Sequence, residues 1–172
     1  MGQNFRTTNT RIFAEGQFLR WLYVNSRYTF GRAIFYDPVD PYPGRQRNLT
    51  LEVTLQPSSR FNQKVTLDRV EFDRLDDGSR VFTVNVLNTT TTFQLDRHFF
   101  LRAIVQYDNS LHRVLTDFLA SYELMPGTVA YAGYGSLIER REWDGQTWTP
   151  GAGTYSTSQR SLFFKTAYVH RF

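Results

Sequence analysis

The chain of 172 residues has no cysteine, only two lysines among its 20 basic residues, and no long apolar run. Without cysteine, the protein has no disulfide framework and no thiolate metal site. No segment approaches the roughly 18 consecutive apolar residues of a membrane-spanning helix, so helical membrane insertion is excluded. The length lies within the roughly 100–200 residues that are usual for one domain.

Aromatic residues and arginine are abundant instead. Phe, Tyr and Trp make up 16% of the chain, and every basic residue except Lys64 and Lys165 is an arginine. The mean hydropathy of −0.44 is that of a hydrophilic protein. Transmembrane β-strands give the same kind of average, because they alternate apolar and polar residues. The mean hydropathy is therefore compatible with a membrane protein built of β-strands.

Apolar and polar residues alternate with a period of two from about residue 20 to the end of the chain. Residues 49–55, 99–107, 114–124 and 162–172 show this pattern most clearly. Strict alternation indicates strands with one apolar face, and no long segment has helical periodicity. The sequence therefore predicts an all-β protein with strands at 20–36, 46–57, 60–75, 79–95, 97–108, 112–125, 127–142 and 155–172.

Short turns and longer polar loops alternate between these predicted strands. In an up-and-down arrangement, every second connection lies at the same end of the sheet, so one end collects the short turns and the other the long loops. This asymmetry is typical of outer-membrane barrels. The sequence therefore predicts an antiparallel up-and-down transmembrane β-barrel over residues 20–172, with about eight strands.

Two local features modify this prediction. Residues 1–19 form either an N-terminal arm or an extra strand, and an extra strand at about 4–17 would make the chain the C-terminal part of a larger barrel. The alternation also changes phase between Val65–Leu67 and Val70–Phe72. This slip predicts a β-bulge near Asp68–Arg69.

The alternation predicts two faces with different surroundings. Outer-membrane barrels carry a girdle of aromatic residues at each membrane interface. Lipid-interface aromatics are expected at Trp21, Tyr28, Phe30 and Tyr107, and Tyr23 is expected to belong to these girdles too. A polar network inside the lumen is expected from the other face, in which opposite charges pair, for example Arg102 with Asp117 or Glu123. The predicted lipid-facing residues are Leu49, Leu51, Val53, Leu55, Phe99, Leu101, Val105, Phe118, Tyr122, Phe164 and Tyr168, and the predicted lumen residues are Arg102, Gln106, Asp117, Glu123, Lys165 and Arg171. Alternation alone is equally compatible with a soluble barrel whose apolar face points inward.

The chain ends in an aromatic residue preceded by alternating apolar residues. Phe164, Tyr168 and Phe172 resemble the C-terminal β-signal of bacterial outer-membrane proteins, which the barrel-assembly machinery recognises. His170 departs from that pattern, where an apolar residue is usual. The resemblance implies outer-membrane insertion with the barrel-assembly machinery as a partner during biogenesis.

Three segments resemble a family of uncharacterised bacterial proteins. They are residues 99–108 (FFLRAIVQYD), 122–128 (YELMPGT) and 160–165 (RSLFFK). In that family a C-terminal outer-membrane β-barrel follows an N-terminal module similar to family-nine carbohydrate-binding modules. The similarity is clearest over roughly residues 97–172. It implies a fold and a location but supplies no catalytic residues.

Few residues suggest chemistry. Ser110, His112, Asp108 and Asp117 together would suit a hydrolase only in a specific geometry. No His spacing indicates a metal site, so no catalytic, cofactor-binding or metal-binding residue is predicted. The arginines are spread along the chain rather than clustered, which disfavours nucleic acid as a partner. Lipopolysaccharide phosphates are a simpler partner for Arg45, Arg47, Arg80, Arg113, Arg140 and Arg141, because guanidinium binds phosphate in a bidentate manner.

The sequence thus predicts a non-enzymatic bacterial outer-membrane barrel, acting as a membrane anchor or a passive passage for small solutes. Its expected surroundings are the lipid bilayer and lipopolysaccharide. The alternative is a soluble lipocalin-like β-barrel that binds a small apolar ligand. The first residues show no export signal, which favours the alternative. The polar opposite face and the terminal Phe172 favour the outer membrane.

Overall fold

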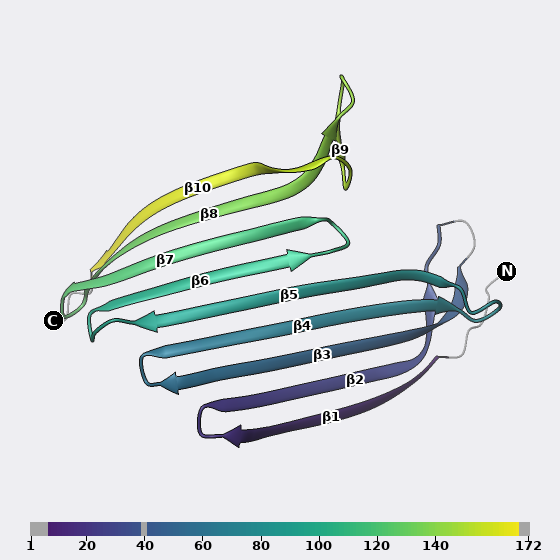
Figure 1. Ribbon diagram of the computed structural model, residues 1–172, viewed down its shortest axis with the longest axis horizontal. Helices are drawn as coiled ribbons and strands as arrows, with labels where there is room; N and C mark the ends of the chain where they lie inside the picture. The colour runs from purple at the N-terminus through teal and green to yellow at the C-terminus, as the bar shows by residue number, and fades with distance from the viewer. Residues whose placement is uncertain (1–6, 39–40, 169–172) are drawn as a thin grey trace.

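The computed structural model describes residues 7–38 and 41–168. Within them the chain forms one antiparallel sheet of ten strands and no helix (Figure 1). No helix in this described part is long and apolar enough to cross a membrane. The strands are β1 (Thr8–Leu19), β2 (Leu22–Phe35), β3 (Tyr42–Ser58), β4 (Phe61–Arg74), β5 (Arg80–Gln94), β6 (Phe99–Asp108), β7 (Arg113–Met125), β8 (Thr128–Trp143), β9 (Trp148–Pro150) and β10 (Thr154–Tyr168).

The sheet is an up-and-down meander. Each long strand pairs with its neighbour in sequence, in the order β1-β2-β3-β4-β5-β6-β7-β8-β10, and the short β9 pairs with β8 outside this path. The predicted all-β, antiparallel, up-and-down fold is confirmed. The eight predicted strands correspond to β2 through β8 and β10, while β9 was not predicted.

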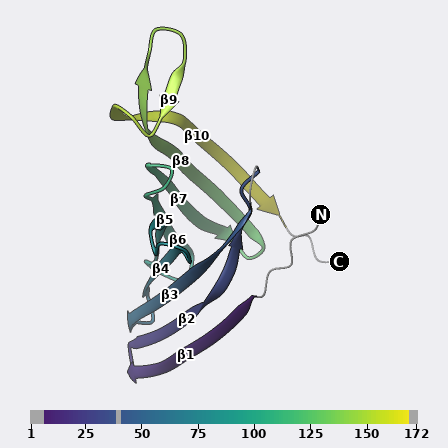
Figure 2. The same ribbon diagram turned by 90° about the vertical axis from the view of Figure 1, so that its right-hand side faces the viewer.

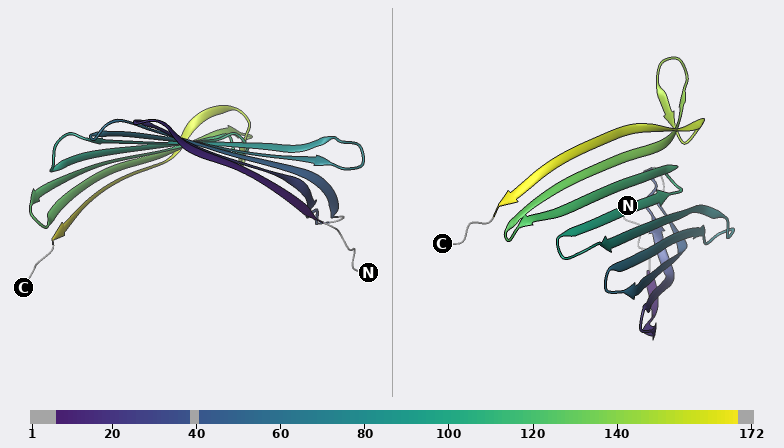
Figure 3. Two further views of the ribbon diagram at one scale, coloured as in Figure 1. Left: turned by 90° about the horizontal axis from the view of Figure 1, so that it is seen from below. Right: turned by 60° about the vertical axis from the view of Figure 1, so that its left-hand side comes forward.

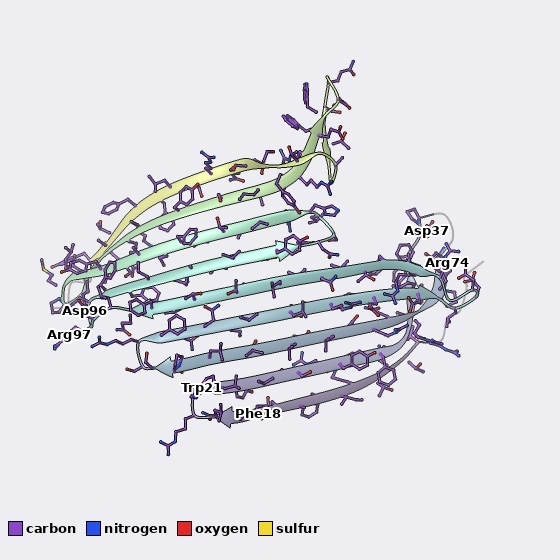
Figure 4. The ribbon with its side chains drawn as sticks, in the orientation of Figure 1. Phe18, Trp21, Asp37, Arg74, Asp96 and Arg97 are labelled. Carbon is purple, nitrogen blue, oxygen red and sulfur yellow. The ribbon has the colours of Figure 1, made fainter. Side chains whose placement is uncertain are left out.

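The two kinds of connection lie at opposite ends of the sheet, as the sequence predicts. The connections between β1 and β2, β3 and β4, β5 and β6, and β7 and β8 form the turn end. Those between β2 and β3, β4 and β5, β6 and β7, and β8 and β10 start and finish at the loop end. Figure 4 shows Trp21, Asp96 and Arg97 at the turn end and Asp37 and Arg74 at the loop end.

Polar side chains shape the turns themselves. At the turn end, the backbone N–H groups of His98 and Phe99 donate to Asp96 Oδ1 at 2.7 and 2.9 Å. These bonds hold the pKa of the Asp96 carboxyl below its ordinary value. At the loop end, Asp144 accepts the N–H groups of Gln146 and Thr147 in the same way.

The N-terminal segment is a strand. β1 pairs with β2 from Thr8 opposite Arg32 to Leu19 opposite Leu22, so the extra-strand alternative holds for Thr8–Leu19. The path therefore contains nine long strands. Because successive strands are antiparallel, β1 and β10 run in the same direction, from the loop end to the turn end.

The predicted bulge near Asp68–Arg69 is wrong. Both residues keep an unbroken register, opposite Thr50 and Leu49 on β3 and opposite Val86 and Asn85 on β5. The hydrophobic pattern changes phase because the two faces of β4 exchange their character near the loop end. The register instead shifts after the pair Phe72–Phe82, where an extra β5 residue separates that pair from Asp73 opposite Arg80.

The sheet is a single twisted layer whose strands arch along their length (Figures 2 and 3). β1 and β10 are its two edges, and they do not pair with each other. Among the described residues, Phe72 is the only large hydrophobic residue that is buried, with 2% of its surface exposed. Residues 7–38 and 41–168 by themselves therefore have almost no core.

The one small core is an aromatic cluster at the loop end. Phe72 stacks on Phe82 with ring centroids 5.8 Å apart, and Phe35 lies 5.7 Å from Phe72 and 5.2 Å from Tyr42. Arg74 caps it, with its guanidinium carbon 4.3 Å from the centre of the Tyr42 ring. The cluster joins β2, β3, β4 and β5.

Gly44 provides the space for the Phe72 ring. A Cβ at Gly44 would lie 2.2 Å from two ring carbons of Phe72, whereas a Cβ at Gly16 would meet nothing within 4 Å. We therefore expect Gly44→Ala to destabilise the fold by about 1–3 kcal/mol through overpacking. The matched control, Gly16→Ala, should leave stability unchanged or raise it slightly. The urea midpoint of unfolding measures both, and equal midpoints for the two variants would contradict this account.

Candidate functional site

One face of the sheet carries apolar residues on every long strand, interrupted on β4 and β5 by the polar residues Gln63, Thr89 and Thr91. Residues directly opposite each other in an antiparallel pair point to the same side, so the register assigns each residue to a face. The eleven predicted lipid-facing residues all fall on the same face, which we call the apolar face. The members of this set on β3, β6, β7 and β10 are Leu49, Leu51, Val53, Leu55, Phe99, Leu101, Val105, Phe118, Tyr122, Phe164 and Tyr168.

The apolar face is uncovered. Phe118 and Tyr122 are both 46% exposed, and on the edge strand Leu162 and Phe164 are 82% and 74% exposed. No element of the described chain packs over these side chains, because the sheet is the only layer. Burying such a surface is the main source of folding free energy. Something outside this sheet must therefore cover it.

The opposite face is polar over most of its area. The register places Arg102, Gln106, Asp117, Glu123 and Lys165 together on this polar face, and Arg171 lies outside the described residues. Glu52 and Lys64 form an ion pair there at 2.7 Å. Their role as a lumen network remains a prediction.

The predicted pairing of Arg102 with Asp117 or Glu123 does not form. In the described part of the chain, Arg102 Nε is buried without a hydrogen-bond partner. Arg102 stands opposite Leu119 on β7 and Thr92 on β5, and neither residue is a carboxylate. The two acids lie further along the strands, so register rather than charge decides the nearest neighbours of Arg102.

The predicted interface aromatics lie near the two ends of the strands. Tyr28, Phe30 and Tyr107 are on the apolar face toward the loop end, and Trp21 is in the β1–β2 turn with 45% of its surface exposed. The prediction for Tyr23 is wrong. The register puts this residue on the polar face, where its hydroxyl donates to Glu15 at 3.1 Å.

The predicted assembly signal is described in part. Phe164 and Tyr168 lie on the apolar face of β10, opposite Ala132 and Thr128. Phe172 and His170 lie outside the described residues. β10 is an edge strand whose outer backbone groups pair with no other strand of the described sheet.

A shallow groove crosses the apolar face toward β10. Its volume is about 440 Å³, and small, aromatic and aliphatic residues line it. The small residues include Ala103, Ala120 and Ala132, and the aromatic residues include Phe118 and Tyr134. Such a groove accepts an apolar chain and offers few polar contacts to orient one.

The strongest polar site on the apolar face is a network of charges at the loop end, which the sequence did not predict. Glu71 and Asp73 are nearly buried, with 13% and 9% of their side chains exposed. Arg47 reaches Glu71 at 3.5 Å and Asp73 at 2.5 Å, and Arg69 Nε donates to Glu71 at 2.8 Å. Arg80 binds Glu71 at 3.1 Å and also donates to Asp73.

The register shift after Phe72 completes this network. The extra residue in β5 turns Arg80 onto the apolar face, where it stands opposite Asp73. Arg47, Arg69 and Arg80 come from three strands and are far apart in sequence. The alternation of Arg69, Glu71 and Asp73 along β4 was the signal available, but their partners depend on register.

The possible hydrolase residues do not assemble. Ser110 Oγ donates to Asp108 Oδ1 at 2.6 Å, and the Ser110 and Leu111 N–H groups donate to the same oxygen. Asp108 thus shapes the β6–β7 loop. No hydrogen bond joins Ser110 to His112 within the described chain, and Asp117 lies in β7 opposite Ile104 and Gly135.

No group of three or more potential metal-binding side chains occurs in residues 7–38 and 41–168. Comparison with known proteins finds no matching family model, no matching curated protein and no matching solved structure. The resemblance to barrels that follow a carbohydrate-binding-like module therefore remains a prediction.

The charge network should contribute to stability. Glu71→Gln leaves Arg69 and Arg80 without their shared carboxylate, so we expect a lower urea midpoint than in the unsubstituted protein. Glu52→Gln is the control, since it removes the same charge from the more exposed pair with Lys64. The difference between the two variants should persist in 1 M salt, because salt screens the more exposed Glu52–Lys64 pair strongly and the nearly buried network much less. A Glu71→Gln midpoint equal to that of Glu52→Gln would show that the network is not stabilising.

Proposed function

We propose that this sheet is the wall of a β-barrel in the bacterial outer membrane, serving as a membrane anchor or a passive passage for small solutes. The observation that carries the proposal is the uncovered face on which every long strand places apolar residues. Domains in water bury such a face under a second layer. A transmembrane barrel needs no second layer, because lipid covers its outside and closure satisfies the edges.

The dimensions of the apolar face support this reading. On β6 the face runs from Phe99 to Tyr107, a rise of about 27 Å at about 3.4 Å per residue. A strand tilted by about 35–45° then spans a height of about 19–22 Å, most of the apolar band of about 25 Å in outer-membrane barrels. The segregation of short turns and long loops to opposite ends is also typical of these proteins.

The number of strands favours a barrel larger than this sheet. β1 and β10 run in the same direction, so pairing them directly would join parallel strands. Antiparallel closure requires an odd number of additional strands between these two edges. Bacterial outer-membrane barrels have even strand numbers, and larger ones leave room for a water-filled lumen.

Location and biogenesis belong to the same proposal. Phe164 and Tyr168 stand on the apolar face of the edge strand β10, as a β-signal recognised by the barrel-assembly machinery would. Lipid and lipopolysaccharide would then surround the barrel. The resemblance to barrels of carbohydrate-binding-like proteins agrees with this location, and we propose no enzymatic activity for the sheet.

The groove of about 440 Å³ on the apolar face favours a second candidate, a soluble lipocalin-like barrel for a small apolar ligand. In that case the apolar face would turn inward and the polar face outward. The two candidates thus predict opposite environments for the same side chains.

Gel mobility distinguishes the two at the level of the whole chain. A membrane barrel should be insoluble without detergent and migrate differently in unboiled and boiled samples, because the closed barrel resists denaturation by the detergent. A soluble monomer with no mobility shift would reject the membrane proposal. Conductance in planar bilayers then separates an open passage from a plugged anchor.

Adjacent residues on β3 report which face meets lipid. The chain has no native cysteine, so Val53→Cys and Thr54→Cys each carry a single spin label on the apolar and polar face, respectively. In lipid vesicles the label at 53 should collide mainly with oxygen, which concentrates in the bilayer, and the label at 54 mainly with a water-soluble nickel chelate. The reverse preference, or a label at 53 shielded from both, would favour the soluble barrel.

A further inference from the structure

The loop end of the apolar face carries more arginines than its own acids neutralise. Arg32 stands opposite Arg45, Arg45 opposite Asp73, and Asp73 opposite Arg80, so four strands form one row of charges. In the next row Phe30, Arg47 and Glu71 stand side by side. Arg69 follows one row further. We call Arg32, Arg45, Arg47, Arg69 and Arg80 the arginine cluster.

The cluster is divided into two groups. Arg47, Arg69 and Arg80 are held by Glu71 and Asp73, but their side chains remain 35–46% exposed. Arg32 and Arg45 are exposed and form no ion pair within the described residues. Like charges directly opposite each other in a sheet are destabilising. An anion bound between Arg32 and Arg45 would relieve this repulsion.

Arg47, Arg69 and Arg80 are already oriented and can still donate hydrogen bonds to an anion. Each guanidinium has five N–H donors, and the bonds to Glu71 and Asp73 use only some of them. The carboxylates fix these guanidinium groups in place, so little side-chain freedom is lost when an anion binds. With five arginines and two carboxylates, the site carries a formal charge of +3.

The surroundings indicate an amphiphilic ligand rather than a simple ion. A small pocket of about 110 Å³ lies among Tyr28, Arg47, Leu49, Arg69 and Glu71. Directly below the cluster toward the turn end, the same face becomes aliphatic, with Leu51, Leu67 and Leu87 in one row. A ligand with anionic groups at one end and acyl chains at the other matches both surfaces.

We propose that the arginine cluster binds the phosphate groups of lipopolysaccharide, with the acyl chains of its lipid A lying on the aliphatic rows below. The inference rests on the proposed membrane barrel, and it specifies where on that barrel the lipid is held. It also divides the loop-end arginines by face, because Arg113 and Arg141 lie on the polar face and take no part in this site.

Binding of fluorescent diphosphoryl lipid A to the full chain in detergent, followed by anisotropy, tests the site. Arg32→Gln/Arg45→Gln should weaken binding by about tenfold or more, since it removes two charge-assisted donors that hold no internal partner. The control is Arg11→Gln/Arg27→Gln, which removes the same charge from exposed positions on the polar face and should change affinity less than twofold.

Two further ligands identify what the site recognises. Monophosphoryl lipid A should bind more weakly than the diphosphoryl form, and inorganic phosphate at the same phosphate concentration should not displace lipid A. Displacement by inorganic phosphate would overturn the lipid assignment, and equal losses in both double variants would reduce the effect to unspecific charge attraction.

The outcomes also separate this site from the barrel itself. A folded, heat-modifiable barrel whose Arg32→Gln/Arg45→Gln variant binds lipid A normally would overturn the site alone. A soluble chain without a mobility shift would overturn both the barrel and the lipid site.

Discussion

The structure depends on lateral hydrogen bonding between strands within a single layer. Each long strand between the two edges pairs with a neighbouring strand on both sides, but neither face is covered by another element of the described chain. Each face must therefore match its own surroundings. The alternation of the sequence separates an aliphatic and aromatic surface from a polar one, and the fold is stable only where two such environments meet it.

Near the loop end, the two faces of the same strands exchange roles. Phe72 lies between Glu71 and Asp73 in sequence, so it points to the polar face while both acids point to the apolar face. On one side it joins the aromatic cluster with Phe35, Tyr42 and Phe82, and on the other the acids hold three arginines. Because of this exchange, the apolar surface ends at a row of charged residues near the loop end.

The sequence was sufficient for the long strands and for most of their faces, because alternation is local, but it missed the short β9 and placed Tyr23 on the wrong face. Leu49 to Leu55 and Phe99 to Tyr107 were therefore assigned to one face correctly. The missing partners of Arg102 and the false bulge at Asp68–Arg69 depend on which residues stand opposite, and that is fixed by pairing along whole strands. Arg45, Arg47 and Arg80 were expected to contact phosphate. The same dependence concealed that they assemble with Arg32 and Arg69, because these five residues come from four strands.

A meander has only nearest-neighbour contacts between strands, so its rigidity need not be uniform. Side chains that reach across several strands are what couple one hairpin to the next. The aromatic cluster links β2 to β5 on one face, and the arginine–carboxylate network links β3 to β5 on the other. In the described chain, β6 to β10 have no comparable side-chain clusters that span several strands on both faces. We therefore expect β2 to β5 to be the more rigid part of the sheet, and β6 to β10 to be the part whose curvature can change.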